Sequence, residues 1–253
     1  MESPSKKLRF SSPPSLSSSS CAHAPLKAWL ASMSKSSKPS DLGLDRVEVR
    51  ADAHGGMGLF AAQPLEPGAV VFTVPRAAVV SPEVVNADSA VGCDGTFAAF
   101  PYPFRAAHWL VLARRDPHHP FNPFVRTLPA APPNAPWWSA RSRSWLQGSN
   151  LGFACESARN LLATQWAEAG QAADAAAVQA FLAGVTLEDM RWGMGCYDSR
   201  RLPLRLSGVS QGKASTDDSG AATGEGVMVP LLDFGNHHAD AKVFNTCMKL
   251  NNW

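Results

Sequence analysis

Hydrophobic residues recur along much of the chain at the spacing of an amphipathic helix. Residues 26–31 (LKAWLA) place Leu26, Trp29 and Leu30 on one face of a short helix. Thr186 and Asp189 form a [ST]-x-x-[DE] pattern, which is typical of the first turn of a helix. The spacing predicts helices at 26–31, at 105–115, over much of 152–183 and at 187–198.

Alternating or continuous apolar runs predict a smaller set of strands. Val47 and Val49 alternate with polar residues, and a glycine-rich break at 55–58 then precedes a return to extended structure. The predicted strands are 46–50, 59–62, a buried strand at 70–74 and a final strand at 227–232.

The order of these elements is β, then helical, then β. Strands separated by about a hundred residues must pair non-locally, so we expect one α+β domain with a helical insertion. Residues 207–226 are rich in Ser, Gly and charge and predict a mobile surface loop.

Composition limits the functions that the chain can have. It has 253 residues, 45% of them hydrophobic, and no apolar run approaches the length needed to cross a bilayer, so we expect no membrane partner. The five cysteines are dispersed and form no C-x-x-C pair, which favours a reducing compartment. Beyond residue 40 the net charge is −3, with no basic stripe, so we expect no nucleic-acid partner.

The first 40 residues differ from the rest of the chain. They carry six basic residues and one acidic residue, and the first 25 are rich in Ser and Pro. This composition is typical of an organelle transit peptide, and it is equally that of a disordered tail.

The segment VMVPLLDFGNHHAD (227–240) concentrates polar side chains after an apolar run. A metal site could use Asp233, His237, His238 and Asp240. Adjacent histidines on extended backbone point to opposite faces, however, and no E-x-x-H pair or distant Cys/His set completes a coordination sphere. A polar turn after a buried strand is the simplest alternative.

Five segments together resemble the SET-domain protein methyltransferases. The resemblance is to the plant class with a long insertion, whose members methylate lysines of the Rubisco large subunit. The matching segments, in order over about 26–245, are HGGMGLFAAQPLEPGAVVFTVP, LVLARRDPHHPFNPFVRTLP, WLQGSNLG, FLAGVTLEDMRWGMGCYDSRRL and VMVPLLDFGNHH.

The resemblance implies S-adenosylmethionine as cofactor and a lysine-bearing protein as substrate, either the Rubisco large subunit or another abundant protein. It implies that Ser199 and Asp233 line the lysine channel. The tryptophans at 109, 145, 166 and 192 we interpret as packing residues and not as a methyl-lysine cage. The implied cofactor-binding residues are Gly55, Met57, Arg200, Asn236 and His237.

The resemblance also predicts a SET-type β-fold of small sheets that is C-terminally truncated here. Such proteins continue into a segment with a methyl-transfer tyrosine, whereas this chain has only Tyr102 and Tyr197, in other contexts. We therefore expect no catalytic residue, little or no transfer activity, and an exposed strand edge at 227–232.

The predicted organisation has five parts, which are a leader at 1–42 with a short helix near 26–31, the first half of the β-fold at 43–100, the helical insertion at 101–206, the loop at 207–226, and the start of the second half at 227–253.

Three functions remain open at this point. They are an S-adenosylmethionine-dependent protein-lysine methyltransferase or an incomplete fragment of one, a non-catalytic interaction protein derived from that family, and a metal-dependent hydrolase. The leader and the best-known substrate of the family together predict the chloroplast, with cytoplasm or nucleus as alternatives.

We predict that a fluorescent fusion of residues 1–45 enters chloroplasts, because the segment is basic, Ser-rich and poor in acidic residues. The measurement is confocal localisation in leaf cells. A fusion that stays in the cytosol contradicts the prediction.

Overall fold

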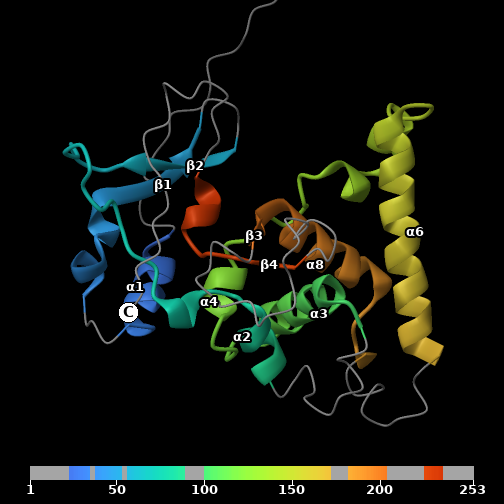
Figure 1. Ribbon diagram of the computed structural model, residues 1–253, viewed down its shortest axis with the longest axis horizontal. Coiled ribbons are helices and arrows are strands. Elements are labelled where there is room, and N and C mark those ends of the chain that lie inside the picture. The colour runs from blue at the N-terminus through green and yellow to red at the C-terminus, as the bar shows by residue number, and fades with distance from the viewer. Residues whose placement is uncertain are drawn as a thin grey trace, which may run out of the picture.

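A small β-hairpin lies at one side of the molecule and a helical body at the other (Figure 1). The computed structural model describes residues 23–34, 38–52, 56–88, 100–171, 182–203 and 225–235. The predicted loop at 207–226 therefore lies almost entirely outside the described residues. No described helix has the length and hydropathy needed to cross a membrane.

The hairpin consists of β1 (Val47–Ala51) and β2 (Met57–Ala61), which pair antiparallel from Val47 opposite Ala61 to Ala51 opposite Met57. Val47 and Val49 point into the core, while Arg50 lies on the exposed face. The alternation seen in the sequence is thus the alternation of a half-buried strand, and the predicted strand is confirmed.

The predicted N-terminal helix is α1 (Ala24–Ser32), and it packs into the body of the fold. Leu26 and Leu30 are fully buried, and the Trp29 indole N–H donates to the Pro120 carbonyl at 2.7 Å. The Trp29 ring also makes an edge contact with Phe121. Residues 24–32 are therefore part of the folded core.

Two helices form the centre of the helical body, α3 (Tyr102–Arg115) and α8 (Leu187–Arg200), and they make the most extensive contact of any described pair of elements. α8 begins at a capping box, in which Asp189 N–H donates to the Thr186 hydroxyl at 3.2 Å and the Asp189 carboxylate accepts from Thr186 N–H at 2.8 Å. This confirms the predicted helix start.

Gly193 lets the two central helices approach closely. A Cβ at this position would lie 2.3 Å from the Ala107 carbonyl oxygen of α3. A side chain there would push two backbones apart, so the absence of a side chain is a packing requirement.

Other elements surround this pair. The helix α6 (Asn150–Gln171) lies at the outer edge of the molecule (Figure 1) and fully buries only three of its residues, Cys155, Leu162 and Ala169. The remaining elements are η1 (Pro39–Leu42), η2 (Leu44–Arg46), η3 (Arg76–Ala78), α2 (Pro82–Ala87), α4 (Asn122–Val125), η6 (Ala135–Trp137), α5 (Ala140–Ser144), β3 (Leu202–Pro203), β4 (Gly226–Val227) and η8 (Leu232–Phe234).

The predicted strand at 227–232 is shorter than expected, and the prediction of an exposed edge is wrong for its described residues. β4 pairs with β3 through Val227 and Leu202, and Met228 forms a bridge with Val80. Val227, Met228 and Leu231 are fully buried, because partners lie along the segment and the chain then turns inward at Leu231.

Two further expectations are corrected. The predicted buried strand at 70–74 is an extended segment that pairs with no strand in the described part of the chain, and Val70 is 61% exposed. Thr73 N–H donates to the Leu42 carbonyl at 2.8 Å, and Arg46 Nη1 donates to the Val70 carbonyl at 2.7 Å. Val71, Phe72 and Val74 pack against the core, so the segment is attached beside the η1 turn and not within a sheet. Trp145 is 85% exposed and does not pack, whereas Trp109 and Trp192 are buried as expected.

A buried polar network fixes the core beside Trp109. The Asp88 carboxylate accepts from the Trp109 indole at 2.8 Å and lies 2.9 Å from His119 Nε2. Phe121 N–H donates to His119 Nδ1 at 3.1 Å, which makes Nδ1 the acceptor and leaves Nε2 to donate to Asp88. Three distant segments are thereby joined with every group satisfied.

We predict that Gly193→Ala destabilises the protein by roughly 1–3 kcal/mol, because the new methyl group overlaps the α3 backbone. Gly170→Ala in α6 is the matched control, since no atom lies within 4 Å of the place that its Cβ would take, and it should be neutral or stabilising by up to about 1 kcal/mol. Urea unfolding followed by circular dichroism measures both. Equal effects of the two substitutions would contradict the packing role of Gly193.

Candidate functional site

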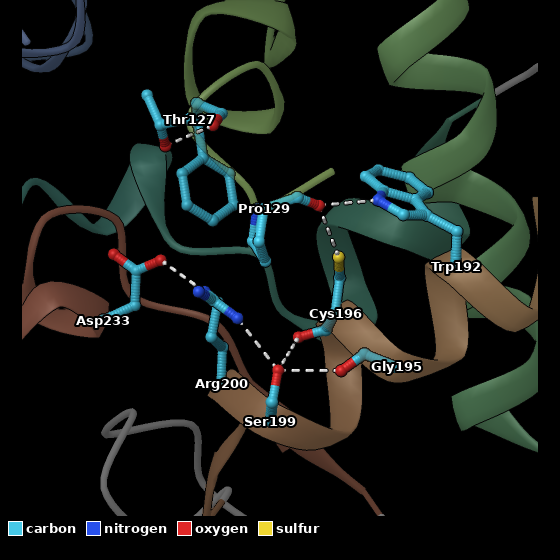
Figure 2. A network of polar contacts seen from close by, with 9 residues as sticks. Thr127, Pro129, Trp192, Gly195, Cys196, Ser199, Arg200 and Asp233 are labelled. Carbon is cyan, nitrogen blue, oxygen red and sulfur yellow. Dashed lines mark hydrogen bonds and ion pairs between the residues drawn. The ribbon is translucent and has the colours of Figure 1, made fainter. Parts of the chain in front are cut away.

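Three elements converge where the helical body meets the hairpin. β2 contacts η8, and the last turn of α8 reaches η8 through an ion pair in which Arg200 Nε lies 3.3 Å from Asp233 Oδ2. Figure 2 shows this pair with Ser199 beside it. Residues that lie far apart in the sequence are thus brought to one place.

Ser199 holds the Arg200 side chain against the helix. The Ser199 hydroxyl donates to the Gly195 carbonyl at 2.7 Å, and Arg200 Nη1 donates to the same hydroxyl oxygen at 2.9 Å (Figure 2). The Arg200 side chain is 17% exposed, so its guanidinium is largely desolvated. A guanidinium fixed by two neighbours is well prepared to bind a carboxylate with its remaining N–H groups.

Asp233 is the most perturbed acid of the site. Its side chain is 2% exposed, and neither carboxylate oxygen has a hydrogen-bond partner among the described residues. Burial raises the pKa of the Asp233 carboxyl to about 6, although the nearby Arg200 guanidinium acts in the opposite direction. The site therefore holds a carboxyl group that titrates close to neutral pH, which is typical of functional sites.

The backbone before Asp233 adopts a rare conformation. Leu231 has φ 72° and ψ −41°, close to a classic γ-turn, and its side chain is fully buried. Such a conformation costs about 1–3 kcal/mol and persists only when packing enforces it. Here the buried Leu231 side chain is the anchor that aims Asp233 at Arg200.

The hairpin turn is closed by Asp52, a residue that sequence reasoning did not single out. Asp52 N–H donates to the Gly56 carbonyl, and Gly56 N–H donates to the Asp52 carboxylate, both at 2.9 Å. Met57 follows and is 39% exposed. Gly55 lies outside the described residues. The signal that could have found Asp52 is its position four residues before Gly56, because Asp side chains often close such turns.

His23 joins the N-terminal helix to the site. Its ring lies edge-on to Phe234, with centroids 5.0 Å apart and planes at 78°. Burial, and then the charge of Lys27, lower the pKa of His23, so the ring is neutral at neutral pH. Nothing in the local sequence marked this contact, because it joins positions more than two hundred residues apart.

The structure therefore brings Arg200, Ser199 and Asp233 together, with Met57 on the neighbouring hairpin. Asn236 and His237, two and three residues after the end of η8 in the sequence, lie outside the described residues. The pairing of the Arg200 and Asp233 side chains was not predicted, since the resemblance assigned Arg200 to a cofactor carboxylate and Asp233 to the lysine channel.

Other chemistries find less support in this part of the chain. Within the described ranges, no three His, Cys, Asp or Glu side chains are placed to hold a metal ion. The metal hypothesis also uses His237, His238 and Asp240, which fall outside those ranges. The described residues therefore do not test it. Burial raises the pKa of the Cys196 thiol to about 12, so it does not supply a thiolate nucleophile at neutral pH.

Comparisons with known proteins identify the fold. No known protein-family profile and no curated protein sequence matches the chain. Among solved structures, the SET domain of LSMT bound to lysine and AdoHcy superposes with a TM-score of 0.65 and 20% identity, over 88% of this chain and 45% of that one. Rubisco LSMT bound to AdoMet gives 0.66 and 21%, over 88% and 46%.

The chain has a SET-domain methyltransferase fold. The predicted α+β fold of small antiparallel sheets with a long helical insertion is thereby confirmed. The chain spans less than half the length of either structure.

We predict that Asp233→Asn flattens the pH dependence of stability between about pH 4 and pH 6. The folded carboxyl has a pKa near 6 against an ordinary value of 3.8, so the folded state binds more protons in this window and loses stability as the pH rises through it. Over this pH range the free energy of unfolding of the wild type should fall by up to about 3 kcal/mol, and that of the variant should not show this fall. Urea unfolding at several pH values measures both proteins, and parallel curves would contradict the assignment.

Proposed function

We propose that this chain is the cofactor- and lysine-binding part of a SET-type, S-adenosylmethionine-dependent protein-lysine methyltransferase. The observation that carries the proposal is the buried Arg200–Asp233 pair with Ser199 beside it, at the meeting point of α8 and η8. These residues belong to two of the five segments of the sequence that resemble the family. The LSMT structures of the same fold, bound to AdoMet, AdoHcy or lysine, support the proposal.

S-adenosylmethionine supplies an electrophilic methyl group when bound. The residues present fit its methionine portion, because Arg200 keeps N–H donors beyond those turned to Asp233 and Ser199. Asn236 and His237, three and four residues after Asp233, are proposed to bind the amine and adenine edge. The backbone of Gly55 and Met57 is proposed to contact the methionine portion.

The acceptor amine must be neutral to attack the methyl group. A lysine with an ordinary pKa of about 10.4 is mostly protonated at neutral pH, and a weakly polar channel shifts it toward the neutral form. Ser199 and the backbone of Asp233 are proposed to line this channel and to orient the amine. The substrate is proposed to be a lysine-bearing protein such as the Rubisco large subunit, and the place of action the chloroplast.

A second function, binding without methyl transfer, is favoured by the positions of the two tyrosines. Tyr102 and Tyr197 pack edge-on with centroids 5.8 Å apart in the core, and the Tyr197 hydroxyl donates to the Gly226 carbonyl at 3.4 Å. Burial raises the pKa of both phenols well above the usual range. Neither hydroxyl is directed to the Arg200–Asp233 pair, so neither supplies the methyl-transfer tyrosine that the family resemblance requires.

We predict that the chain binds S-adenosylhomocysteine and that Arg200→Gln weakens this binding by about tenfold or more, since a charged hydrogen bond contributes roughly 1.5–3 kcal/mol. Isothermal titration calorimetry is the measurement. Arg201→Gln is the matched control, because Arg201 is the next residue and lies 3.6 Å from Asp198 instead of Asp233. Equal losses in the two variants, or no binding by the wild type, would overturn the cofactor assignment.

Radiolabelled methyl transfer to a plant lysate separates the two functions. Little or no labelling together with S-adenosylhomocysteine binding supports a chain that binds without transferring. Robust labelling that Asn236→Ala abolishes supports a catalytic chain, and would mean that a residue other than a tyrosine at the site orients the amine.

A further inference from the structure

A cavity lies toward the other end of α8, away from Arg200 and Asp233. It measures about 510 Å³, which is within the range of ligand-binding pockets. Its walls come from α3, α5, α6, α8 and the connection at 130–140. It shares no residue with the site described above.

The charges around this cavity are unbalanced. Arg114, Arg143, Arg159 and Arg191 line it, against Glu188 and Asp189. Both carboxylates are already engaged, since Glu188 pairs with Arg191 at 2.9 Å and Asp189 pairs at 2.8 Å with Arg115, which does not line the cavity.

Three guanidinium groups are therefore uncompensated. Arg114, Arg143 and Arg159 make no ion pair with any carboxylate in the described ranges. Burial, and then the charges of Arg143 and Arg191, lower the pKa of Arg159, as expected where cations are crowded. Such a cluster attracts anions, and guanidinium groups bind carboxylates with particular strength.

Aromatic surface accompanies these charges. Trp137, Trp138 and Trp192 line the same cavity, and Arg114 stacks over the Trp192 ring at 4.3 Å. The Trp137 indole N–H is buried and has no hydrogen-bond partner among the described residues, so one donor in the wall stays unsatisfied. The lining thus suits a ligand that combines carboxylates with an apolar group.

The cavity and Ser199 lie along one face of α8. Positions 188, 192, 195 and 199 follow helical spacing, and Figure 2 shows Trp192, Gly195 and Ser199 in succession. Pro132 and Trp137 cover this face at Gly195, where a Cβ would lie within 2.6 Å of both. The helix rises about 10 Å over the seven residues from Trp192 to Ser199. Because Pro132 and Trp137 cover the helix between them, a peptide that reaches both places passes over these side chains and needs at least about three extended residues.

We propose that this cavity binds an acidic and apolar segment of the protein substrate, a few residues away from the lysine that enters beside Ser199. The inference rests on the proposed function for the identity of the partner. A nucleic acid suits the surface less well, because beyond residue 40 the chain carries a net charge of −3 with no basic stripe to follow a phosphate backbone. Three arginines that line one cavity match two or three carboxylates.

The test is fluorescence anisotropy with the full chain and a short fluorescein-labelled peptide that carries Glu, Phe and Asp about three to five residues before a Lys. Its control peptide has Gln and Asn at the acidic positions. We expect the acidic peptide to bind at least about tenfold more tightly than the control, and increasing salt to remove this preference.

Variants of the chain locate the binding. The double variant Arg143→Gln/Arg159→Gln should lose the preference for the acidic peptide, whereas Arg141→Gln, in the same helix α5 but outside the cavity, should keep it. Arg143 and Arg159 also donate to the Trp138 and Pro136 carbonyls, so the double variant could disturb the connection. Arg114→Gln avoids this, because the side chain of Arg114 stacks on Trp192, and it should weaken binding severalfold with an unchanged circular dichroism spectrum.

Several results would overturn the proposal. They are equal binding of the two peptides, equal loss in Arg141→Gln, full binding by both cavity variants, and displacement of the peptide by micromolar inorganic phosphate or a single-stranded oligonucleotide. Titration with S-adenosylhomocysteine separates this inference from the proposed function. Peptide binding without cofactor binding would support the peptide-binding role of the cavity and contradict the methyltransferase assignment. Cofactor binding without a preference for the acidic peptide would support the methyltransferase assignment and contradict the role of the cavity.

Discussion

The contact between α3 and α8 is the constraint on which the rest of the structure depends. Gly193 lets the backbones approach, and on the other side of α8 the Trp192 indole donates to the Pro129 carbonyl at 2.9 Å (Figure 2). α8 is therefore held from two directions. Because it carries Ser199 and Arg200 near one end and lines the arginine-rich cavity near the other, a small displacement of this helix would move both sites together.

Local signals in the sequence were sufficient for elements whose structure is locally determined. The capping box at Thr186 and the apolar face of residues 26–31 predicted two helices, because a few neighbouring residues supply the stabilising contacts. The strand predicted at 70–74 was wrong because strand formation depends on residues that are distant in the sequence. Its composition suits a strand, but a strand also needs a partner, and the neighbouring chain there is the 3-10 turn at 39–42.

The candidate site was predictable only in part for the same physical reason. Motif resemblance marked Ser199, Arg200 and Asp233 separately, but the ion pair between two of them depends on how η8 is folded against α8. That geometry follows from a buried leucine in a rare backbone conformation, which no propensity scale predicts. Asp52 and His23 were missed because their partners are set by the turn and by long-range packing.

The site combines two features that oppose stability, a strained Leu231 and a buried carboxyl group without hydrogen-bond partners among the described residues. Fold stability alone does not explain the buried carboxyl group, since an apolar side chain in its place would remove the cost of desolvation. Features of this kind concentrate where a ligand completes the structure, and bound ligand then contributes stability through its preference for the folded state.

The docking of α1 sets a boundary for any processing of the N-terminal leader. Leu26 and Leu30 fill the core, and His23 touches Phe234 beside the candidate site. A chain cleaved after His23 would therefore lose part of this packing. Cleavage further along the chain would remove core residues of the domain and leave a cavity where their side chains pack.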